Sequence, residues 1–374
     1  MHYLLIIGIF LSFFLQFLLF SKKGRTAADT VLAVWMFIFG IHLFGFYLYS
    51  LGYWQEYPHM MGLMIPLPLL HGPMLFLYIL YSLRPDQPFN HRVYLHFLPA
   101  IIIVLLLTEF YFFFTAEQKL MVDRGEIQRY NVLGNVILIS YIVSGLTYPV
   151  VSYRMLGRYT SMLRENFAYE ETINLNWLRY CIFGIGVVYV VAAVVSVMRE
   201  GMGMDLGINA DMVIYFFCVL FIFLLGFFGI RQQGIFTDAG LNASELVEPR
   251  QTAEYRRSGL KDAEAARYHK TLIDLMHHKK PYLEPKLTII SLSGELGISV
   301  NYLSQVINQY EGKNFYDFVN EYRVNEFKKR AADPANKNFS ILAIAYDSGF
   351  NSKSAFNQVF KKITGKTPSE FIRG

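Results

Sequence analysis

Charged side chains are scarce in this sequence. Of its 374 residues only 17% are Asp, Glu, Lys or Arg, whereas 54% are hydrophobic and 17% are aromatic. A soluble globular chain carries about 25% charged residues, so this composition predicts a membrane protein. Cysteine is scarcer still. Cys181 and Cys218 both lie inside apolar runs, which excludes a disulfide framework or a cysteine-based zinc site.

Sequence patterns of catalytic sites are missing as well. The apolar part has no HExxH motif, no GxSxG motif and no pair of intramembrane aspartates, so we expect no enzymatic activity. Its lysines are Lys22, Lys23 and Lys119, all outside the apolar segments, which excludes a retinal pigment of the usual kind. We also expect no cofactor and no metal site. The adjacent His277 and His278 point about 100° apart on a helix and suit a helix end better than a metal ion.

Positive charge is concentrated in the C-terminal part. Residues through Ile230 carry 13 basic and 13 acidic side chains, and residues from Arg231 onward carry 21 basic and 16 acidic ones. The net charge of +5 therefore belongs to the last 144 residues. A surplus of this size does not by itself establish an anionic partner.

Seven apolar stretches have the length of about 18–23 residues that is needed to cross about 30 Å of hydrocarbon. They lie near residues 3–20, 31–51, 60–82, 93–114, 132–153, 177–198 and 212–230. The odd-numbered connections are the more basic ones, with Lys22, Arg84 and Arg154 among their residues, whereas the second connection has no Lys or Arg. Because basic loops stay in the cytoplasm, we expect a multi-pass protein of the bacterial inner (cytoplasmic) membrane. Its N-terminus would lie outside and its C-terminus in the cytoplasm.

Ionisable residues within the predicted spans are candidates for sensing a ligand. They are His42, His71, His96 and Glu109. His71 stands out because IPLPLLHGP surrounds it with prolines, which remove backbone donors and favour a kinked helix with free carbonyls. Such a kink suits a pocket for an extracellular or membrane-borne ligand. A packing kink with a neutral, hydrogen-bonded histidine is the competing interpretation.

The tail contains one pattern twice. TIISLSGELGISVNYLSQVINQYEGK aligns with SILAIAYDSGFNSKSAFNQVFKKITGK if one residue is inserted in the turn of the second copy. Thr288 and Ser340 then match as helix N-caps, and Gly297 matches Gly349 in the turn. Each copy predicts a capped helix, a sharp glycine turn and a second helix, which is a helix-turn-helix.

The segment from Ala345 to Pro368, AYDSGFNSKSAFNQVFKKITGKTP, closely resembles the signature of the AraC-type DNA-binding domain, and ISVNYLSQVIN resembles the first motif of that domain. The resemblance covers about the last 90 residues. The whole chain resembles, more loosely, bacterial membrane-embedded AraC-type regulators. The resemblance implies two recognition helices that enter successive major grooves of double-stranded DNA. The residues implied in DNA binding are Asn301, Tyr302, Ser304 and Gln305 in the first motif and Ser352, Lys353, Ser354, Asn357, Gln358 and Lys361 in the second.

The sequence also departs from the family pattern. Gln358 lies where the family often has Arg or Lys, and Gln305 lies at the matching place of the first copy, so phosphate contacts should be weaker. Ser293 replaces a usual alanine, and Gly294 beside it lowers helix propensity by about 1 kcal/mol. By contrast, TPSE at the end of the signature predicts a capping box with proline in the first helical position, which is a structural role.

These patterns together predict an all-α protein with four parts. They are a seven-helix transmembrane sensor bundle over residues 1–230, a linker over 231–259, a connecting helix over 260–284 and a double helix-turn-helix DNA-binding domain over 285–374. We expect a one-component transcriptional regulator whose partners are double-stranded DNA, membrane lipid and an extracellular or membrane-borne ligand. The sequence leaves open whether the chain forms a homodimer. The alternatives are a transporter or intramembrane enzyme with a regulatory DNA-binding tail, and a membrane scaffold whose tail binds protein. The long connection between residues 154 and 177 carries apolar residues at helical spacing, so we expect it to touch the DNA-binding domain directly.

Overall fold

The structure is a computed structural model that describes residues 2–84, 89–169, 175–202, 204, 209–231 and 262–373. The regular elements in these ranges are helices, and an isolated bridge between Phe167 and Thr288 is the one strand-like pairing among them. The all-α fold class is therefore confirmed for the described residues. The predicted linker, apart from Arg231, lies outside them.

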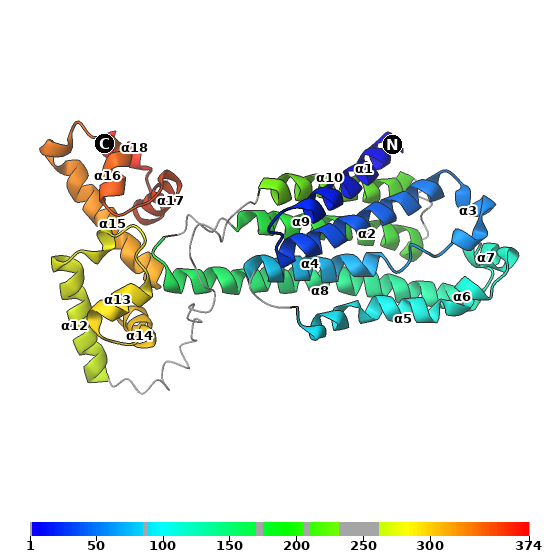
Figure 1. The fold of residues 1–374 in the computed structure, drawn as a ribbon, viewed down its shortest axis with the longest axis horizontal. Helices are drawn as coiled ribbons and strands as arrows, with labels where there is room; N and C mark the ends of the chain where they lie inside the picture. The colour runs from blue at the N-terminus through cyan, green and yellow to red at the C-terminus, as the bar shows by residue number, and fades with distance from the viewer. Residues whose placement is uncertain are drawn as a thin grey trace. The chain divides into compact units, whose positions relative to one another are not determined.

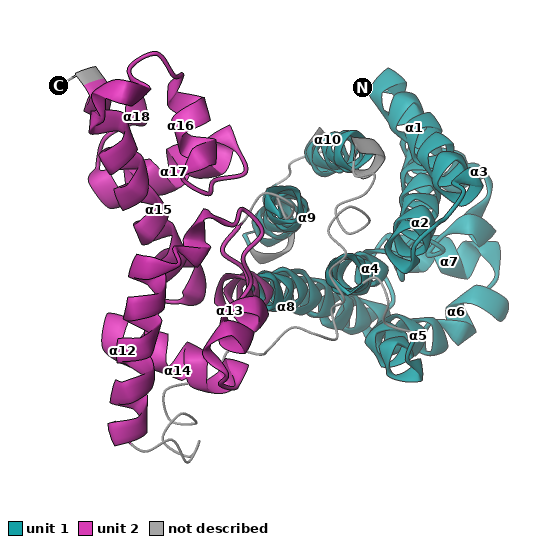
Figure 2. Cartoon of the chain, turned by 60° about the vertical axis from the view of Figure 1, so that its left-hand side comes forward, with its two compact units in different colours: residues 1–156, 175–233 teal, residues 157–174, 234–374 magenta. Residues whose placement is uncertain are grey.

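The chain divides into two compact units, which Figure 2 colours teal and magenta. Unit 1 consists of Met1–Leu156 and Leu175–Gln233, and unit 2 consists of Gly157–Asn174 and Gly234–Gly374. Residues 157–174 belong to the predicted sensor domain by sequence position, yet they group with the C-terminal residues.

Unit 1 is built from helices of very different lengths (Figure 1). They are α1 (His2–Ser21), α2 (Ala27–Ser50), α3 (Tyr53–Glu56), η1 (Pro58–Met60), α4 (Pro68–Leu83), η2 (His91–Phe97), α5 (Leu98–Leu106), α6 (Thr108–Phe112), α7 (Ala116–Asp123), the first part of α8 (Gln128–Asn166), α9 (Asn176–Ser196), the π-helical η3 (Val197–Gly201) and α10 (Asn209–Arg231).

Five helices of the described chain, α1, α2, α8, α9 and α10, are long and apolar enough to cross a membrane by length and composition. The third and fourth predicted spans correspond to shorter apolar helices, Pro68–Leu83 and His91–Leu106. The former begins at a proline, whose missing N–H is harmless in the first helical turn. The latter is followed by a break at Leu107 before α6. That the chain crosses the membrane seven times remains a prediction.

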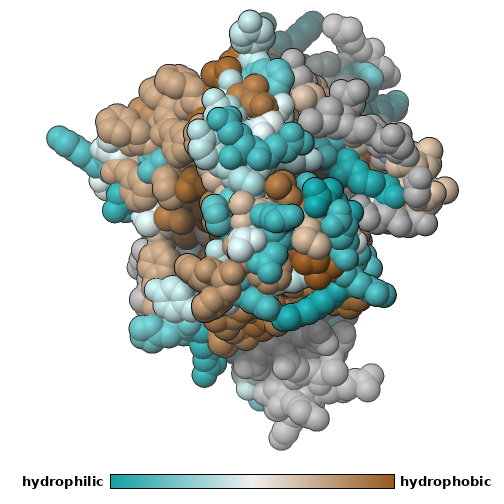
Figure 3. Space-filling model, turned by 90° about the vertical axis from the view of Figure 1, so that its right-hand side faces the viewer, coloured by the Kyte–Doolittle hydropathy of each residue, from teal (hydrophilic) through white to brown (hydrophobic). Residues whose placement is uncertain are grey.

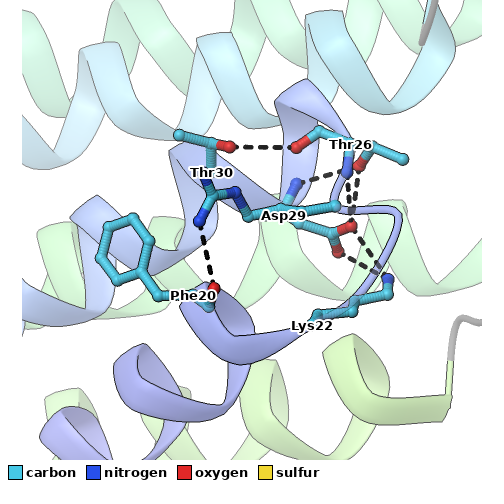
Figure 4. A network of polar contacts seen from close by, with 6 residues as sticks. Phe20, Lys22, Thr26, Asp29 and Thr30 are labelled. Atoms are coloured by element: carbon cyan, nitrogen blue, oxygen red, sulfur yellow. Dashed lines mark hydrogen bonds and ion pairs between the residues drawn. The ribbon is translucent and has the colours of Figure 1, made fainter.

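A polar network fixes the turn between α1 and α2 (Figure 4). The Thr26 side chain accepts a hydrogen bond from the Asp29 N–H at 3.1 Å, and the Asp29 carboxylate accepts one from the Thr26 N–H at 2.9 Å. Lys22 pairs with the same carboxylate at 2.9 Å. This capping box satisfies backbone donors that have no partner inside the helix, and it sets the point at which the chain leaves α1 and enters α2.

Apolar side chains lie both inside unit 1 and on its surface. Trp35 and Phe39 of α2 are buried and pack against the Phe221 ring of α10, with ring centroids 5.6 and 5.8 Å apart. Phe10 of α1 and Val190 of α9, in contrast, are 70% and 55% exposed. Figure 3 shows one face on which hydrophobic side chains, in brown, reach the surface beside hydrophilic ones. A helix that is apolar on all sides suits an apolar environment.

Unit 2 contains two pairs of short helices and a longer helix between them. Its elements are the end of α8, α12 (Asp262–His278), η5 (Pro281–Leu283), α13 (Ile289–Leu296), α14 (Val300–Glu311), α15 (Phe315–Ala332), η6 (Pro334–Asn336), α16 (Ile341–Asp347), α17 (Lys353–Thr364) and α18 (Pro368–Arg373).

Helix α15 contributes to two separate hydrophobic cores. Phe318 and Val319 belong to the core that α12, α13 and α14 share, and Val324 and Phe327 belong to the core that α16 and α17 share. All four side chains are at most 1% exposed. Each pair of short helices therefore has its own core, and α15 joins the two.

Candidate nucleic-acid interface

Both predicted helix-turn-helix motifs form, with the predicted caps and glycine turns. The Thr288 side chain caps α13 by accepting from the Ser291 N–H, and the Ser340 side chain caps α16. Gly297 and Gly349 follow these helices with φ angles of 66° and 93°. A side chain with a Cβ atom rarely adopts such positive angles, whereas glycine does so freely. The local expectations about caps and turns are therefore confirmed.

The second recognition helix, α17, turns a polar face outward. The predicted DNA-binding residues Lys353, Ser354, Asn357, Gln358 and Lys361 are all exposed. Residues three and four apart share one side of a helix, so the last four of them form a single stripe. Ser352 is partly buried and caps the helix, because its hydroxyl accepts from the Ala355 N–H at 3.1 Å. Phe356 and Phe360 hold the opposite face in the core.

The first recognition helix, α14, is much less accessible. Ser304 and Gln305 are each 8% exposed, and Asn301 and Tyr302 are partly buried. The Ser304 hydroxyl donates a hydrogen bond to the Glu165 carboxylate at 3.4 Å. The structure thus brings Ser304 against a residue of the long connection, a contact that the sequence predicts only in general terms.

The residues that follow α8 are part of the first motif's packing. Ala168 is 1% exposed and belongs to the same core as Leu303. Its carbonyl accepts from Asn320 Nδ2 at 2.9 Å and from Arg323 Nη1 at 2.7 Å, and its N–H donates to the Leu287 carbonyl at 3.2 Å. The expected direct contact between the connection and the DNA-binding domain is confirmed at this residue.

Arg323 of α15 is a buried cation that organises the backbone around it. It is 1% exposed, and besides the Ala168 carbonyl it donates to the Tyr282 carbonyl at 2.8 Å and the Glu284 carbonyl at 2.7 Å. Burial lowers the pKa of Arg323 to about 10, so the guanidinium stays charged at neutral pH. The planar fork of donors suits several acceptors that lie in different directions.

Lysine is unevenly distributed between the two recognition helices. Helix α14 has no Lys or Arg, whereas α17 has Lys353, Lys361 and Lys362. Lys362 pairs with Asp317 at 2.7 Å. Because cationic side chains supply most phosphate contacts, the second motif has the better means of holding a DNA backbone.

The capping box that TPSE predicts is confirmed. The Thr367 N–H donates to the Glu370 carboxylate at 2.7 Å, and the Glu370 N–H donates to the Thr367 hydroxyl at 3.3 Å. The hydrogen bond from the Thr367 N–H, together with its hydroxyl, lowers the pKa of Glu370. These residues fix the start of α18 and have a structural role.

Two of the four ligand-sensing candidates meet in unit 1. His42 Nδ1 lies 3.0 Å from His71 Nε2, the Trp35 indole donates to His71 Nδ1 at 3.1 Å, and the Tyr215 hydroxyl lies 3.2 Å from His42 Nε2. An indole N–H can only donate, so a neutral His71 carries its proton on Nε2 and donates to His42. The chain of hydrogen bonds satisfies both rings as neutral groups, which favours the packing interpretation of His71.

The other two candidates have different partners. His96 Nδ1 lies 3.1 Å from the Tyr148 hydroxyl, and Glu109 pairs with Arg129 at 2.9 Å at an exposed position. Among the described residues, no group of three or more His, Cys, Asp or Glu side chains could hold a metal ion.

Comparison with known proteins finds a family match within unit 2. Residues 292–374 match the family described as "Helix-turn-helix domain". The chain is 25% identical over 105 residues to the HTH-type transcriptional regulator GlxA of Rhizobium meliloti (strain 1021), covering 28% of this chain and 32% of that protein. It is 29% identical over 85 residues to the probable transcription factor PqrA of Proteus vulgaris, covering 23% of this chain and 67% of that protein.

One solved structure, of a protein of unknown function from Listeria innocua, is 29% identical, with 28% of this chain and 92% of that chain covered and a TM-score of 0.24. The chain spans about a third of the first curated relative and about two thirds of the second. By name, one curated relative is a transcriptional regulator and the other is a probable transcription factor. The C-terminal part of this chain therefore carries an AraC-type helix-turn-helix domain.

Proposed function

We propose that this chain is a membrane-embedded transcriptional regulator that binds DNA sequence-specifically through unit 2. The observation that carries the proposal is the exposed stripe of α17, on which Asn357, Gln358 and Lys361 lie side by side. Asn and Gln can bind adenine through two hydrogen bonds, and Lys can bind guanine or phosphate. The names of the two curated relatives, a transcriptional regulator and a probable transcription factor, support this proposal.

Two recognition helices imply a DNA site with two half-sites. When both α14 and α17 enter the major groove on one side of the duplex, their half-sites lie about 34 Å apart, which is one helical turn. Both motifs pack against α15, and each has its own core within the same unit. This supports the use of both recognition helices by one unit.

Unit 1 is proposed to lie in the bacterial inner membrane and to sense an extracellular or membrane-borne ligand. Its long apolar helices and outward apolar side chains support contact with lipid. With the N-terminus outside and the C-terminus in the cytoplasm, unit 2 shares a compartment with the chromosome. A ligand shifts the equilibrium between two states of the bundle only if it binds them with unequal affinity.

DNA binding is tested with the full chain in lipid nanodiscs, titrated against duplexes selected from a random library. Asn357→Ala should relax the preference at one base pair by about 1–3 kcal/mol, because its amide reads a base edge. Lys361→Ala should weaken binding to all sequences and lower the salt slope by about 0.9, since one phosphate contact is lost. Gln358→Arg should do the reverse, because it adds a cation to the same stripe. Absence of salt-dependent binding would favour the scaffold whose tail binds protein.

The membrane topology is tested with a reporter that works only in the cytoplasm. Fused after Arg25 or at the C-terminal Gly374 it should be active, and fused after Gln55 it should be inactive, because the second connection has no basic residues. Immunoblots of the fusions control for expression. Equal activity at Arg25 and Gln55 would contradict the proposed orientation.

A further inference from the structure

The two recognition helices differ in accessibility at equivalent positions. Asn357 and Gln358 follow a buried Phe356 in α17 and are exposed, whereas Ser304 and Gln305 follow a buried Leu303 in α14 and are only 8% exposed. The two motifs share one fold and one helix register, so the difference comes from elements outside the repeated pattern. Helix α12 packs against α14, and its His269 bonds to Glu311 of α14. The end of α8 bonds to Ser304.

Of these two elements, the end of α8 is the one that contacts the side of α14 on which Ser304 lies. Glu165 accepts the hydrogen bond from Ser304, and the guanidinium of Arg164 lies 5.9 Å from the ring centroid of Tyr316 in α15. Three residues beyond Glu165, Ala168 is fixed by the side chains of α15 that donate to its carbonyl. The segment is therefore held in unit 2 by buried hydrogen bonds at Ala168.

The position of the α8 end prevents α14 from contacting the bases of DNA. Asn301, Ser304 and Gln305 are spaced three and four residues apart and share one side of the helix. Glu165 lies on this side, so a duplex that used the first motif would have to occupy the same space and bring its phosphates toward a carboxylate. Like charges at close range oppose such an approach.

We propose that the segment 164–168 is an autoinhibitory cover on the first recognition helix. In the described conformation α17 is free to read DNA and α14 is not, and use of both half-sites requires that the cover be displaced. This inference rests on the proposed function of unit 2 in DNA binding. It also identifies what a signal would have to move. Helix α8 (Gln128–Asn166) contains both the fifth predicted span and Glu165.

The experiment uses the full chain in lipid nanodiscs as wild type, Glu165→Ala and Glu165→Gln. Each protein selects duplexes from a random library, and hydroxyl-radical footprinting maps the protected bases. Glu321→Ala is the matched control, because it removes one carboxylate from the same unit at a site paired with Lys313. It therefore reproduces the change in net charge without touching the cover.

The wild type and Glu321→Ala should protect one half-site, and Glu165→Ala should protect two half-sites about 34 Å apart, because it removes both the carboxylate and the hydrogen bond to Ser304. Glu165→Gln removes only the charge and keeps an oxygen that can accept from Ser304, so its protection of the half-site read by α14 should lie between the two. Glu165→Ala should also bind the two-half-site duplex at least about 5-fold more tightly than the wild type. Its affinity should be unchanged for a duplex in which the half-site read by α14 is scrambled. A wild-type footprint over both half-sites would overturn the cover and leave the proposed function standing. A Glu165→Ala footprint over a single half-site would overturn it too. Loss of salt-dependent DNA binding in every protein would overturn both.

Discussion

Replacing Arg323 with methionine should lower the free energy of unfolding of unit 2 by at least about 3 kcal/mol. The guanidinium donates at 2.7–2.8 Å to the carbonyls of Ala168, Tyr282 and Glu284. A hydrogen bond from a charged donor contributes about 1.5–3 kcal/mol, and methionine can replace none of the three. The loss should be felt in both halves of unit 2, because α15 belongs to both cores.

Two further variants separate the fork geometry from the charge. Arg323→Lys keeps the positive charge, but a single ammonium group cannot span three carbonyls, so most of the loss should remain. Lys329→Met changes an exposed residue of the same helix and should stay within about 0.5 kcal/mol of the wild type. Hydrogen exchange of peptides from residues 289–364, measured on the full chain in nanodiscs, reports the local stability. A lysine variant as stable as the wild type would show that charge alone suffices.

The helix-turn-helix motifs could be predicted from sequence because their signals are local. Thr288 and Ser340 are caps whose side chains bond to the backbone three residues later, and Gly297 and Gly349 are needed where φ is positive. Such signals act within a few residues of one another, so a short window of sequence contains both partners. The second copy of the pattern supports the same prediction independently.

The accessibility of α14 could not be predicted, because it depends on a distant segment. Ser304 and Glu165 are 139 residues apart in sequence, and Asn320 and Ala168 are 152 apart. The sequence indicates that the connection after the fifth predicted span carries apolar residues at helical spacing, but it does not specify which side chains they contact. A resemblance to a DNA-binding family implies which residues face DNA and says nothing of a cover that lies outside the family's domain.

The partners of His42 and His71 could not be predicted for the same reason. His71 bonds to Trp35 and His42 of α2, and His42 also meets Tyr215 of α10, 173 residues away. An apolar helix gives no periodic signal for which side faces its neighbours when every side is apolar. The third and fourth predicted spans illustrate a related limit. Hydropathy measures apolar length and does not show that one helix begins only at Pro68 or that the other breaks at Leu107.

The two turn glycines should respond very differently to alanine, although they occupy equivalent places. Both have positive φ, so each substitution costs about 1–2 kcal/mol of backbone strain. A Cβ atom on Gly297 would meet nothing within 4 Å. A Cβ atom on Gly349 would lie 2.2 Å from the Tyr282 carbonyl oxygen and 3.0 Å from Arg323 Nε. Overpacking of this kind adds about 1–3 kcal/mol, so Gly349→Ala should be the more destabilising variant by that amount.

The clash at Gly349 should also spread to the rest of unit 2. The Tyr282 carbonyl is held by Arg323 at 2.8 Å, and a shift that relieves the clash must lengthen this hydrogen bond. Gly349→Ala should therefore speed hydrogen exchange in α15 as well as in α16 and α17, whereas Gly297→Ala should affect mainly α13 and α14. In Arg323→Met the bond is already absent, so adding Gly349→Ala should cost less there than in the wild type. If Gly349→Ala lowers the stability equally in the wild type and in Arg323→Met, the Tyr282 carbonyl does not couple the turn to α15. If Gly297→Ala and Gly349→Ala change hydrogen exchange equally, the atoms around Gly349 move aside more easily than their packing indicates.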